Sequence, residues 1–182
     1  MGYHESLTEG RNAVLEAFRS GKTVDRLFVL DGCQDGPVKT ILREAKKQDT
    51  MVQYVKKERL DQLSETKNHQ GVIAYCAACE YAEVSDILEN AKKKGEAPFI
   101  VLLDGIEDPH NLGAIIRTAN QAGAHGVIIP KRRAVGLTAT VARTSAGAVN
   151  YTPVAKVTNL VTVMEDLKKE GMWFVCADMD GE

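Results

Sequence analysis

Two polar side chains, Asn111 and Arg117, have a type and spacing that could support the binding of an anion. Both fall in residues 109–122, a predicted helix with Asp108 as its N-cap and a proline at its first position. Arg117 lies roughly 140° around that helix from Leu112, so it points away from the apolar stripe. A solvated arginine and a capping asparagine explain the two residues taken alone, although a helix N-terminus also suits a bound anion.

The elements around this helix predict that it packs on a buried sheet. Residues 99–103 are a continuous apolar run, which is typical of a parallel strand covered on both faces, and the polar residues 104–108 follow it. Gly123 is placed to end the helix, and Gly113 would let it approach a neighbouring backbone. A second apolar strand then runs up to Lys131. The helix positions expected to face the sheet are Leu112, Ile115, Ile116, Ala119 and Ala122.

The rest of the chain alternates strands with helices, which predicts two α/β domains. The first would hold helices over residues 9–20, 37–47 and 57–64 and strands over residues 24–30, 51–55 and 71–79. The second would add helices over residues 138–146 and 159–169, an extended segment over 149–153 and a buried strand over 172–177. We therefore expect a small α/β sandwich over residues 1–79, a linker helix over residues 80–98, and a parallel-sheet domain with right-handed crossovers over residues 99–182.

The charge balance restricts how the chain could bind nucleic acid. A net charge of −2 over 182 residues argues against indiscriminate coating, so any RNA binding must come from local basic patches. Lys131, Arg132 and Arg133 form such a patch at a predicted strand end, whereas the basic runs at residues 46–47 and 92–94 are interpreted as solvated helix faces. With no apolar run long enough to span a membrane and no signal-peptide pattern, the protein is expected to be cytoplasmic.

Cys76 and Cys79 form a C-x-x-C pair, which invites a zinc or redox interpretation. Residues three apart in a strand point to opposite faces, and no second pair completes a tetrahedral site. We therefore expect two small buried side chains and no metal site. No G-x-G-x-x-G or Walker pattern follows a predicted strand, which disfavours a dinucleotide fold of that type and a P-loop hydrolase.

The segment DPHNLGAIIRTANQAGAHGVIIPKRR, residues 108–133, closely resembles the first signature motif of the SpoU family of RNA ribose 2′-O-methyltransferases, within the SPOUT superfamily. The resemblance continues through SAGAVNYTPVAKVTNL at residues 145–160, and it reaches back to GRNAVLEAF at residues 10–18 and HQGV at residues 69–72. It therefore covers essentially the whole chain. The outer segments are similar to members that carry an N-terminal substrate domain and methylate a guanosine of large-subunit ribosomal RNA, rather than to the shorter tRNA-modifying members.

This resemblance implies a Rossmann-like parallel sheet of the trefoil-knot family and catalytic roles for two residues. Arg117 aligns with the family arginine and Asn111 with the motif asparagine. Because the pKa of an arginine exceeds about 12, it is a poor general base. We expect Arg117 to clamp a phosphate and stabilise the developing alkoxide, with Asn111 fixing that arginine or the ribose. A proton-accepting role for Arg117 stays open if a phosphate drains its proton.

Two further groups of residues become candidate RNA contacts by the same resemblance. Arg11 and Asn12 open the first helix, within the segment that belongs to the RNA-binding domain of the family, although residues at a helix start are often just caps. His69 and Gln70 lie in a polar loop before a strand, which is either an RNA-facing loop or a simple turn. His69 has no second metal ligand at a suitable spacing.

The resemblance also implies S-adenosylmethionine as cofactor and a homodimer as the assembly. Two further family motifs, one glycine-rich with a glutamate and one with a serine-asparagine run, are not among these 182 residues. We therefore expect a catalytic domain incomplete at its C-terminus, with only Ala177 and Asp178 at the edge of the cofactor pocket. The alternatives are a tRNA ribose methyltransferase, a non-catalytic RNA-binding or assembly module and, more remotely, a nucleotide-binding regulator.

Overall fold

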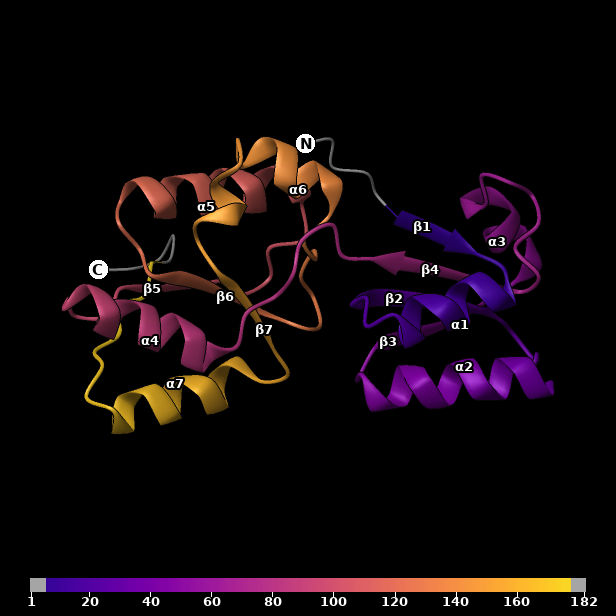
Figure 1. The fold of residues 1–182 in the computed structure, drawn as a ribbon, viewed down its shortest axis with the longest axis horizontal. Coiled ribbons are helices and arrows are strands. Elements are labelled where there is room, and N and C mark those ends of the chain that lie inside the picture. Colours follow the sequence, from indigo (N-terminus) through magenta and orange to yellow (C-terminus); the bar gives the residue numbers. More distant parts are fainter. Residues whose placement is uncertain (1–5, 178–182) are drawn as a thin grey trace.

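The computed structural model describes residues 6–177, which form two α/β domains, each built on its own sheet (Figure 1). The described elements are, in chain order, β1 (Ser6–Glu9), α1 (Arg11–Arg19), β2 (Val24–Leu30), α2 (Gly36–Lys47), β3 (Met51–Val55), α3 (Lys57–Leu63), β4 (Val72–Cys76), α4 (Val84–Lys94), β5 (Ile100–Leu102), α5 (Pro109–Gln121), β6 (Gly126–Pro130), α6 (Ala139–Thr144), the 3₁₀ helix η1 (Ala148–Asn150), β7 (Val154–Val157) and α7 (Leu160–Lys169).

The first domain is a four-stranded mixed sheet in the order β1-β4-β2-β3, with helices on both faces. Strands β2 and β3 run parallel, while β4 is antiparallel to both β1 and β2. Helices α1 and α2 bury Phe18 and Ile41 against one face, where Leu27 and Val29 meet them. Helix α3 buries Leu60 against the opposite face. This arrangement confirms the small α/β sandwich predicted from the alternation of strands and helices.

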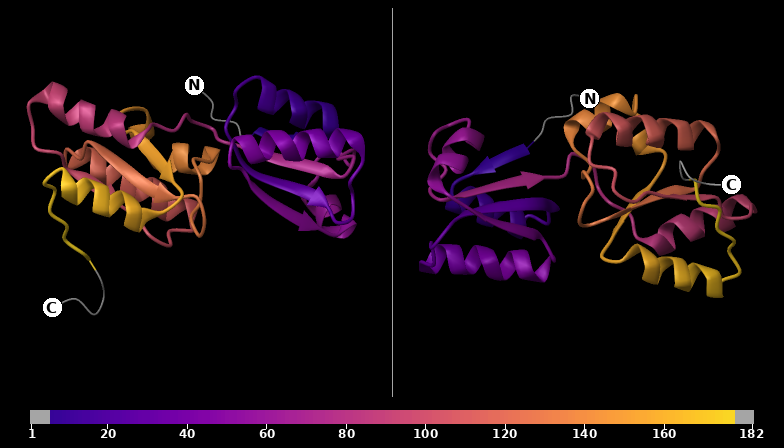
Figure 2. Two further views of the ribbon diagram at one scale, coloured as in Figure 1. Left: turned by 90° about the horizontal axis from the view of Figure 1, so that it is seen from below. Right: turned by 180° about the vertical axis from the view of Figure 1, so that it is seen from behind.

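The second domain has a parallel three-stranded sheet in the order β5-β6-β7, with a helical layer on each face (Figures 1 and 2). Successive residues of β6 point to opposite faces, as the pleat of a strand requires. Val127 and Ile129 pack with α5 and α6, whereas Ile128 packs with α4 and α7. Helix α4 joins the domains and is also part of this second core, because Ile87 is fully buried there.

Helix α5 lies as predicted, with its first residue at Pro109 and its C-cap at Ala122. Asp108 caps it by accepting a hydrogen bond from the backbone of His110 at 3.0 Å. Gly113 is where α5 meets α6, because a Cβ there would lie 1.9 Å from Oγ1 of Thr144. The predicted close approach is confirmed, but Ala122, which we expected to face the sheet, is exposed.

Three segments differ from the sequence-based expectation. Strand β1 was missed because its four residues carry little apolar pattern and depend on pairing with β4. Strand β7 was missed as well, since it is only four residues long and begins directly after Pro153. The segment predicted as extended, residues 149–153, instead holds the last two residues of η1. Residues 172–177, predicted as a buried strand, form none: Trp173 is 96% and Val175 99% exposed, although Phe174 packs on the second core. Without a neighbouring strand to pair with, this pattern does not become a strand.

The C-x-x-C pair also differs from its prediction in one respect. Cys76 ends β4 and is buried, but Cys79 lies beyond the strand and is half-buried. Burial raises the pKa of the Cys79 thiol, which disfavours the thiolate that a metal would need. Among residues 6–177, no three His, Cys, Asp or Glu side chains gather as a metal site would require. Within the same residues, no helix is both long and apolar enough to cross a membrane.

Candidate functional site

The helix α5 presents Asn111 and Arg117 to solvent on opposite sides of the stripe that buries Leu112 and Ile116, roughly 120° apart around the helix axis. Neither polar side chain has a hydrogen bond or ion pair with another residue of the described range 6–177. Both are therefore free to bind a ligand, and the N-terminal turn that carries Asn111 adds the positive end of a helix dipole.

The loop that precedes α5 lies beside the basic loop, which carries the basic run Lys131, Arg132 and Arg133. The backbone N–H of Val135 donates to the carbonyl of Ile106 at 2.9 Å, which joins the two loops directly. Because β5, β6 and β7 are parallel, the segments after Leu102, Pro130 and Val157 all emerge at one edge of the sheet. In open parallel sheets, this carboxyl edge is where ligands bind. The predicted proximity of the basic run to the α5 loop is thus present in the fold.

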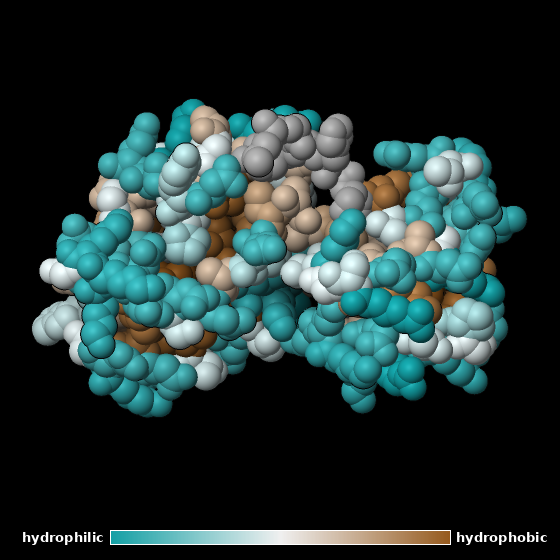
Figure 3. Space-filling model, in the orientation of Figure 1, coloured by the Kyte–Doolittle hydropathy of each residue, from teal (hydrophilic) through white to brown (hydrophobic). Residues whose placement is uncertain are grey.

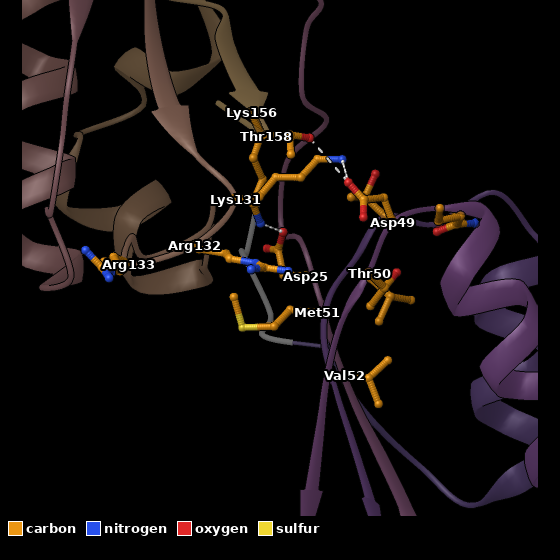
Figure 4. A pocket seen from close by; sticks show the side chains of 13 residues that line it. Asp25, Asp49, Thr50, Met51, Val52, Lys131, Arg132, Arg133, Lys156 and Thr158 are labelled. Atoms are coloured by element: carbon orange, nitrogen blue, oxygen red, sulfur yellow. Dashed lines mark hydrogen bonds and ion pairs between the residues drawn. The ribbon is translucent and has the colours of Figure 1, made fainter. Parts of the chain in front are cut away.

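The basic run faces the first domain across a cleft, in which Lys131 reaches Asp49 (Figure 4). The Lys131 ammonium lies 2.7 Å from Oδ2 of Asp49, and the hydroxyl of Thr158 donates to the same oxygen at 3.3 Å. The hydrogen bond from Lys131 lowers the pKa of the Asp49 carboxyl, so this carboxylate is ionised at neutral pH. Arg132 and Arg133 also line the cleft and are exposed, with no ion pair to a residue in the described part of the chain.

A second acidic residue, Asp25, ties the two domains together at the floor of the cleft. Its side chain is 13% exposed and forms an ion pair with Lys156 of β7. The hydroxyl of Tyr81 donates to Oδ1 of Asp25 at 3.0 Å and accepts from the backbone N–H of Leu137 at 2.8 Å. Burial and the neighbouring carboxylate raise the pKa of Tyr81 well above its ordinary value, so it stays a hydrogen-bond donor. The sequence predicts neither carboxylate as part of the site, because nothing local marks partners that lie 131 residues from Asp25 and 82 residues from Asp49.

The candidate residues of the first domain gather around the start of α1. The Nε of Arg11 donates to the carbonyl of Gln70 at 3.1 Å, and its guanidinium lies 2.6 Å from Asp35. Asn12 and Gln70 line one open hollow of about 590 Å³. The fold therefore brings Asn12 and Gln70 to one surface, while Arg11 is already held by partners within its own domain.

His69 occupies a different position from its neighbours, because its side chain is buried, with 8% of it exposed. Its Nδ1 accepts a hydrogen bond from the backbone N–H of Gly71 at 3.0 Å, so Nε2 carries the proton and faces Asp61 at 3.0 Å. Both ring nitrogens are thus used inside the domain. This geometry gives His69 the role of holding the loop in which Gln70 adopts a φ of 51°. The RNA contact expected of His69 would require the ring to leave both partners.

Glu9 fixes the other end of this loop through four hydrogen bonds. Its carboxylate accepts from the backbone of Glu65 at 2.8 Å and of Thr66 at 3.1 Å, and from the hydroxyls of Ser64 and Thr66. Partial burial would raise the pKa of Glu9, but the hydrogen bonds from Ser64, Thr66 and Glu65 outweigh it and hold the pKa below its ordinary value.

Replacing Glu9 with glutamine is expected to lower the free energy of unfolding by about 1–2 kcal/mol at pH 7, because charge-assisted bonds are lost. A lowered folded-state pKa means that this stabilisation is present above about pH 4.3, the value for an unfolded glutamate, and is lost as the pH falls through the folded-state pKa. Urea unfolding of both proteins across this range measures it. The matched control is Glu58→Gln, an exposed position on α3. A gap between Glu9→Gln and wild type that stays constant down to pH 3 would contradict the assignment.

The two residues expected at a cofactor pocket give no support for one in the described chain. Ala177 is exposed in an irregular segment, and Asp178 lies outside the described residues. None of the hollows found among residues 6–177 that are described above includes Ala177. A cofactor as large as S-adenosylmethionine needs enclosing walls, and these residues do not fit that requirement.

Comparison with known proteins identifies the class of this chain. Residues 7–82 match the family model for RNA 2′-O ribose methyltransferase substrate binding, and residues 98–182 match the model of the SpoU rRNA Methylase family. The chain is 48% identical over 169 residues to YacO of Bacillus subtilis (strain 168), a protein named for the TrmH family of tRNA/rRNA methyltransferases. That match covers 93% of this chain and 68% of YacO. The chain therefore belongs to the SpoU (TrmH-like) family of RNA methyltransferases.

Two further proteins are similar to this chain over most of its length. A relative from Staphylococcus haemolyticus (strain JCSC1435), named for the same family, is 46% identical over 171 residues, which are 94% of this chain and 68% of the relative. The crystal structure of the SpoU methyltransferase AviRb from Streptomyces viridochromogenes, in complex with AdoMet, is similar with a TM-score of 0.44 and 23% identity. That similarity covers 92% of this chain and 59% of AviRb, so the chain spans less than two thirds of that structure.

Proposed function

We propose that the whole protein transfers a methyl group to the ribose 2′-hydroxyl of a guanosine in large-subunit ribosomal RNA, and that it acts as a homodimer. S-adenosylmethionine would supply the methyl group. The observation that carries the proposal is that Asn111 and Arg117 are exposed on α5, a helix that begins at the carboxyl edge of the parallel sheet beside the basic loop. Family membership supports the reaction class, while the choice of ribosomal RNA rests on the resemblance of the first domain.

In this proposal, α5 supplies the groups that hold the reacting ribose. The planar guanidinium of Arg117 would donate two parallel hydrogen bonds to two oxygens of a phosphate next to the target nucleotide. It would also stabilise the negative charge that grows on the 2′-oxygen as the hydroxyl proton passes to solvent water. Asn111 would hold the ribose or the guanidinium in place, which converts a loose encounter into an oriented one.

A methylation assay with the full-length gene product tests this proposal. Methyl transfer from labelled S-adenosylmethionine to ribosomal RNA is measured in parallel with transfer to bulk tRNA. Because a 2′-O-methyl group blocks alkaline cleavage of the adjacent phosphodiester, the modified nucleotide appears as a gap in a hydrolysis ladder. Label in ribosomal RNA at a guanosine supports the proposal. Label confined to tRNA, or on a base, contradicts the choice of substrate or of atom.

The match of residues 7–82 to a substrate-binding family model favours a second candidate function for the 182-residue chain by itself, namely a non-catalytic RNA-binding or assembly module. Such a module would use the same basic loop and the first domain without a cofactor. Calorimetric titration of this chain with S-adenosylmethionine separates the two. We expect weak or no binding, whereas micromolar affinity would show that a pocket exists and would favour the enzyme.

A further inference from the structure

The cleft between the two domains concentrates positive charge from both of them. Its two adjoining hollows, of about 500 and 310 Å³, share Asp25, Met51, Lys131 and Lys156. Together they are lined by two acidic residues, Asp25 and Asp49, and by six basic ones, Arg26, Arg59, Lys131, Arg132, Arg133 and Lys156. Six basic and two acidic side chains give the cleft a net charge of +4, although the net charge of the whole chain is −2.

The arginines of the cleft are not neutralised by neighbouring carboxylates. Arg26 and Arg59 are exposed, and neither has an ion pair with a residue in the described range 6–177; Arg59 donates to Gln62 at 3.3 Å. By contrast, the two lysines are held by Asp49 and Asp25 at the junction of the domains. The geometry thus fixes the lysines while it leaves the guanidinium groups available to an anion.

The smaller hollow also offers an aromatic wall. Tyr75 and Phe28 both line it, their ring centroids 5.8 Å apart in an edge-to-face arrangement. A volume of about 310 Å³ is at the low end for small-molecule pockets, near 300 Å³, which suits one planar base and not a duplex. Aromatic rings next to arginines are how proteins bind unpaired RNA, since bases stack on rings while phosphates meet guanidinium groups.

We propose that this interdomain cleft binds a single-stranded segment of the substrate RNA, with its phosphates on Arg26, Arg59, Arg132 and Arg133 and one base against Tyr75. The proposal rests on the proposed function, because it takes the partner to be RNA. It extends the RNA-binding surface predicted at the basic loop by three residues of the first domain, Arg26, Arg59 and Tyr75. The strand would then run from the cleft along residues 131–137, which touch the loop before α5. Figure 3 shows the narrowing of the surface between the domains, with mostly hydrophilic residues beside it in the lower half of the view.

The test removes the two first-domain arginines of the cleft and compares the RNA binding of this variant with that of a variant that lacks two arginines elsewhere in the same domain. The double variant Arg26→Gln, Arg59→Gln is compared with Arg19→Gln, Arg43→Gln, which removes two exposed arginines from α1 and α2, across the first sheet from α3. Binding of a fluorescein-labelled single-stranded RNA of mixed sequence is titrated against salt, and the same RNA annealed to its complement serves as the duplex probe. With a slope of about 0.7 per phosphate, the cleft variant should lose roughly 1.4 from the slope, and the control should lose nothing.

A second variant, Tyr75→Leu, separates stacking from charge. Loss of one stacked base should weaken single-strand binding on the order of ten-fold without changing the salt slope, and should leave duplex binding unchanged. Equal slopes in wild type and the Arg26, Arg59 variant would overturn the cleft as the RNA path while leaving an RNA function intact. Preference for the duplex would overturn the single-strand assignment. If the wild-type chain binds no RNA at all, the proposed function fails together with the cleft.

Discussion

Replacing Arg117 with alanine is expected to lower the rate of RNA methylation by the full-length gene product by roughly 100-fold or more, as the loss of one oxyanion-stabilising donor does elsewhere. The reason is that the guanidinium would be used most strongly when charge develops on the 2′-oxygen. Its loss should therefore lower kcat, and because the proposed phosphate contact forms before the reaction, it should also raise KM, so that kcat/KM falls more than kcat. Single-turnover methylation of the substrate RNA measures this directly.

The fold should survive this substitution, which makes the result interpretable. Arg117 is exposed and has no partner among residues 6–177, so its removal should change the free energy of unfolding by no more than about 0.5 kcal/mol. Arg43→Ala, at an exposed helix position of the first domain, is the matched control and should retain full activity. Thermal unfolding of all three proteins checks the first point.

Arg117→Lys extends the test from charge to shape. A lysine restores the positive charge but presents a single compact ammonium in place of a planar fork, so it should rescue little of the lost rate. Full rescue by lysine would mean that charge alone is required and that no bidentate contact forms. Wild-type turnover by the alanine variant would leave Arg117 as a solvated surface residue, the simpler interpretation of its position on the helix.

Local signals allowed α5 to be predicted within a residue at each end. Asp108, Pro109 and Gly123 act within one turn of the backbone, and the burial of Leu112 and Ile116 follows from helical spacing. By contrast, β1 and β7 exist because another strand pairs with them. Their short sequences carry no comparable signal, and the apolar run at residues 172–177 lacks such a partner among the described strands.

The residues of the candidate site likewise divide into those that could be predicted from local sequence and those that could not. The exposure of Asn111 and Arg117 could be predicted, because it depends on the phase of one helix. The burial of His69 could not, since it follows from Asp61 and from the backbone of Gly71 closing around the ring. Asp25 and Asp49 were missed for a related reason, because they acquire their roles only when the two domains meet. Contacts between domains are tertiary and leave no periodic pattern in either segment.

Replacing Lys131, Arg132 and Arg133 together with glutamine is expected to lower the slope of log RNA affinity against log salt by about two, since each lost phosphate contact contributes roughly 0.7–0.9. The corresponding loss of affinity at 0.1 M salt is on the order of 100-fold. Salt-titrated binding of ribosomal RNA fragments measures both quantities. The matched control replaces Lys92, Lys93 and Lys94, three exposed lysines at the end of α4, and should leave the slope unchanged.

Replacing Asp49 tests the same basic loop through an expected gain of RNA affinity. Because the Asp49 side chain is 65% exposed, its ion pair with Lys131 is weak in water, and a phosphate can displace it. The lowered pKa of Asp49 keeps the carboxylate charged near neutral pH, where it competes with RNA for the lysine. Asp49→Asn should therefore tighten RNA binding, because a phosphate no longer has to displace the carboxylate from Lys131, while the salt slope stays near that of the wild type. If Asp49→Asn instead weakens binding, the carboxylate positions Lys131 for the RNA, and if the triple variant keeps the wild-type slope, the basic loop is not on the RNA path.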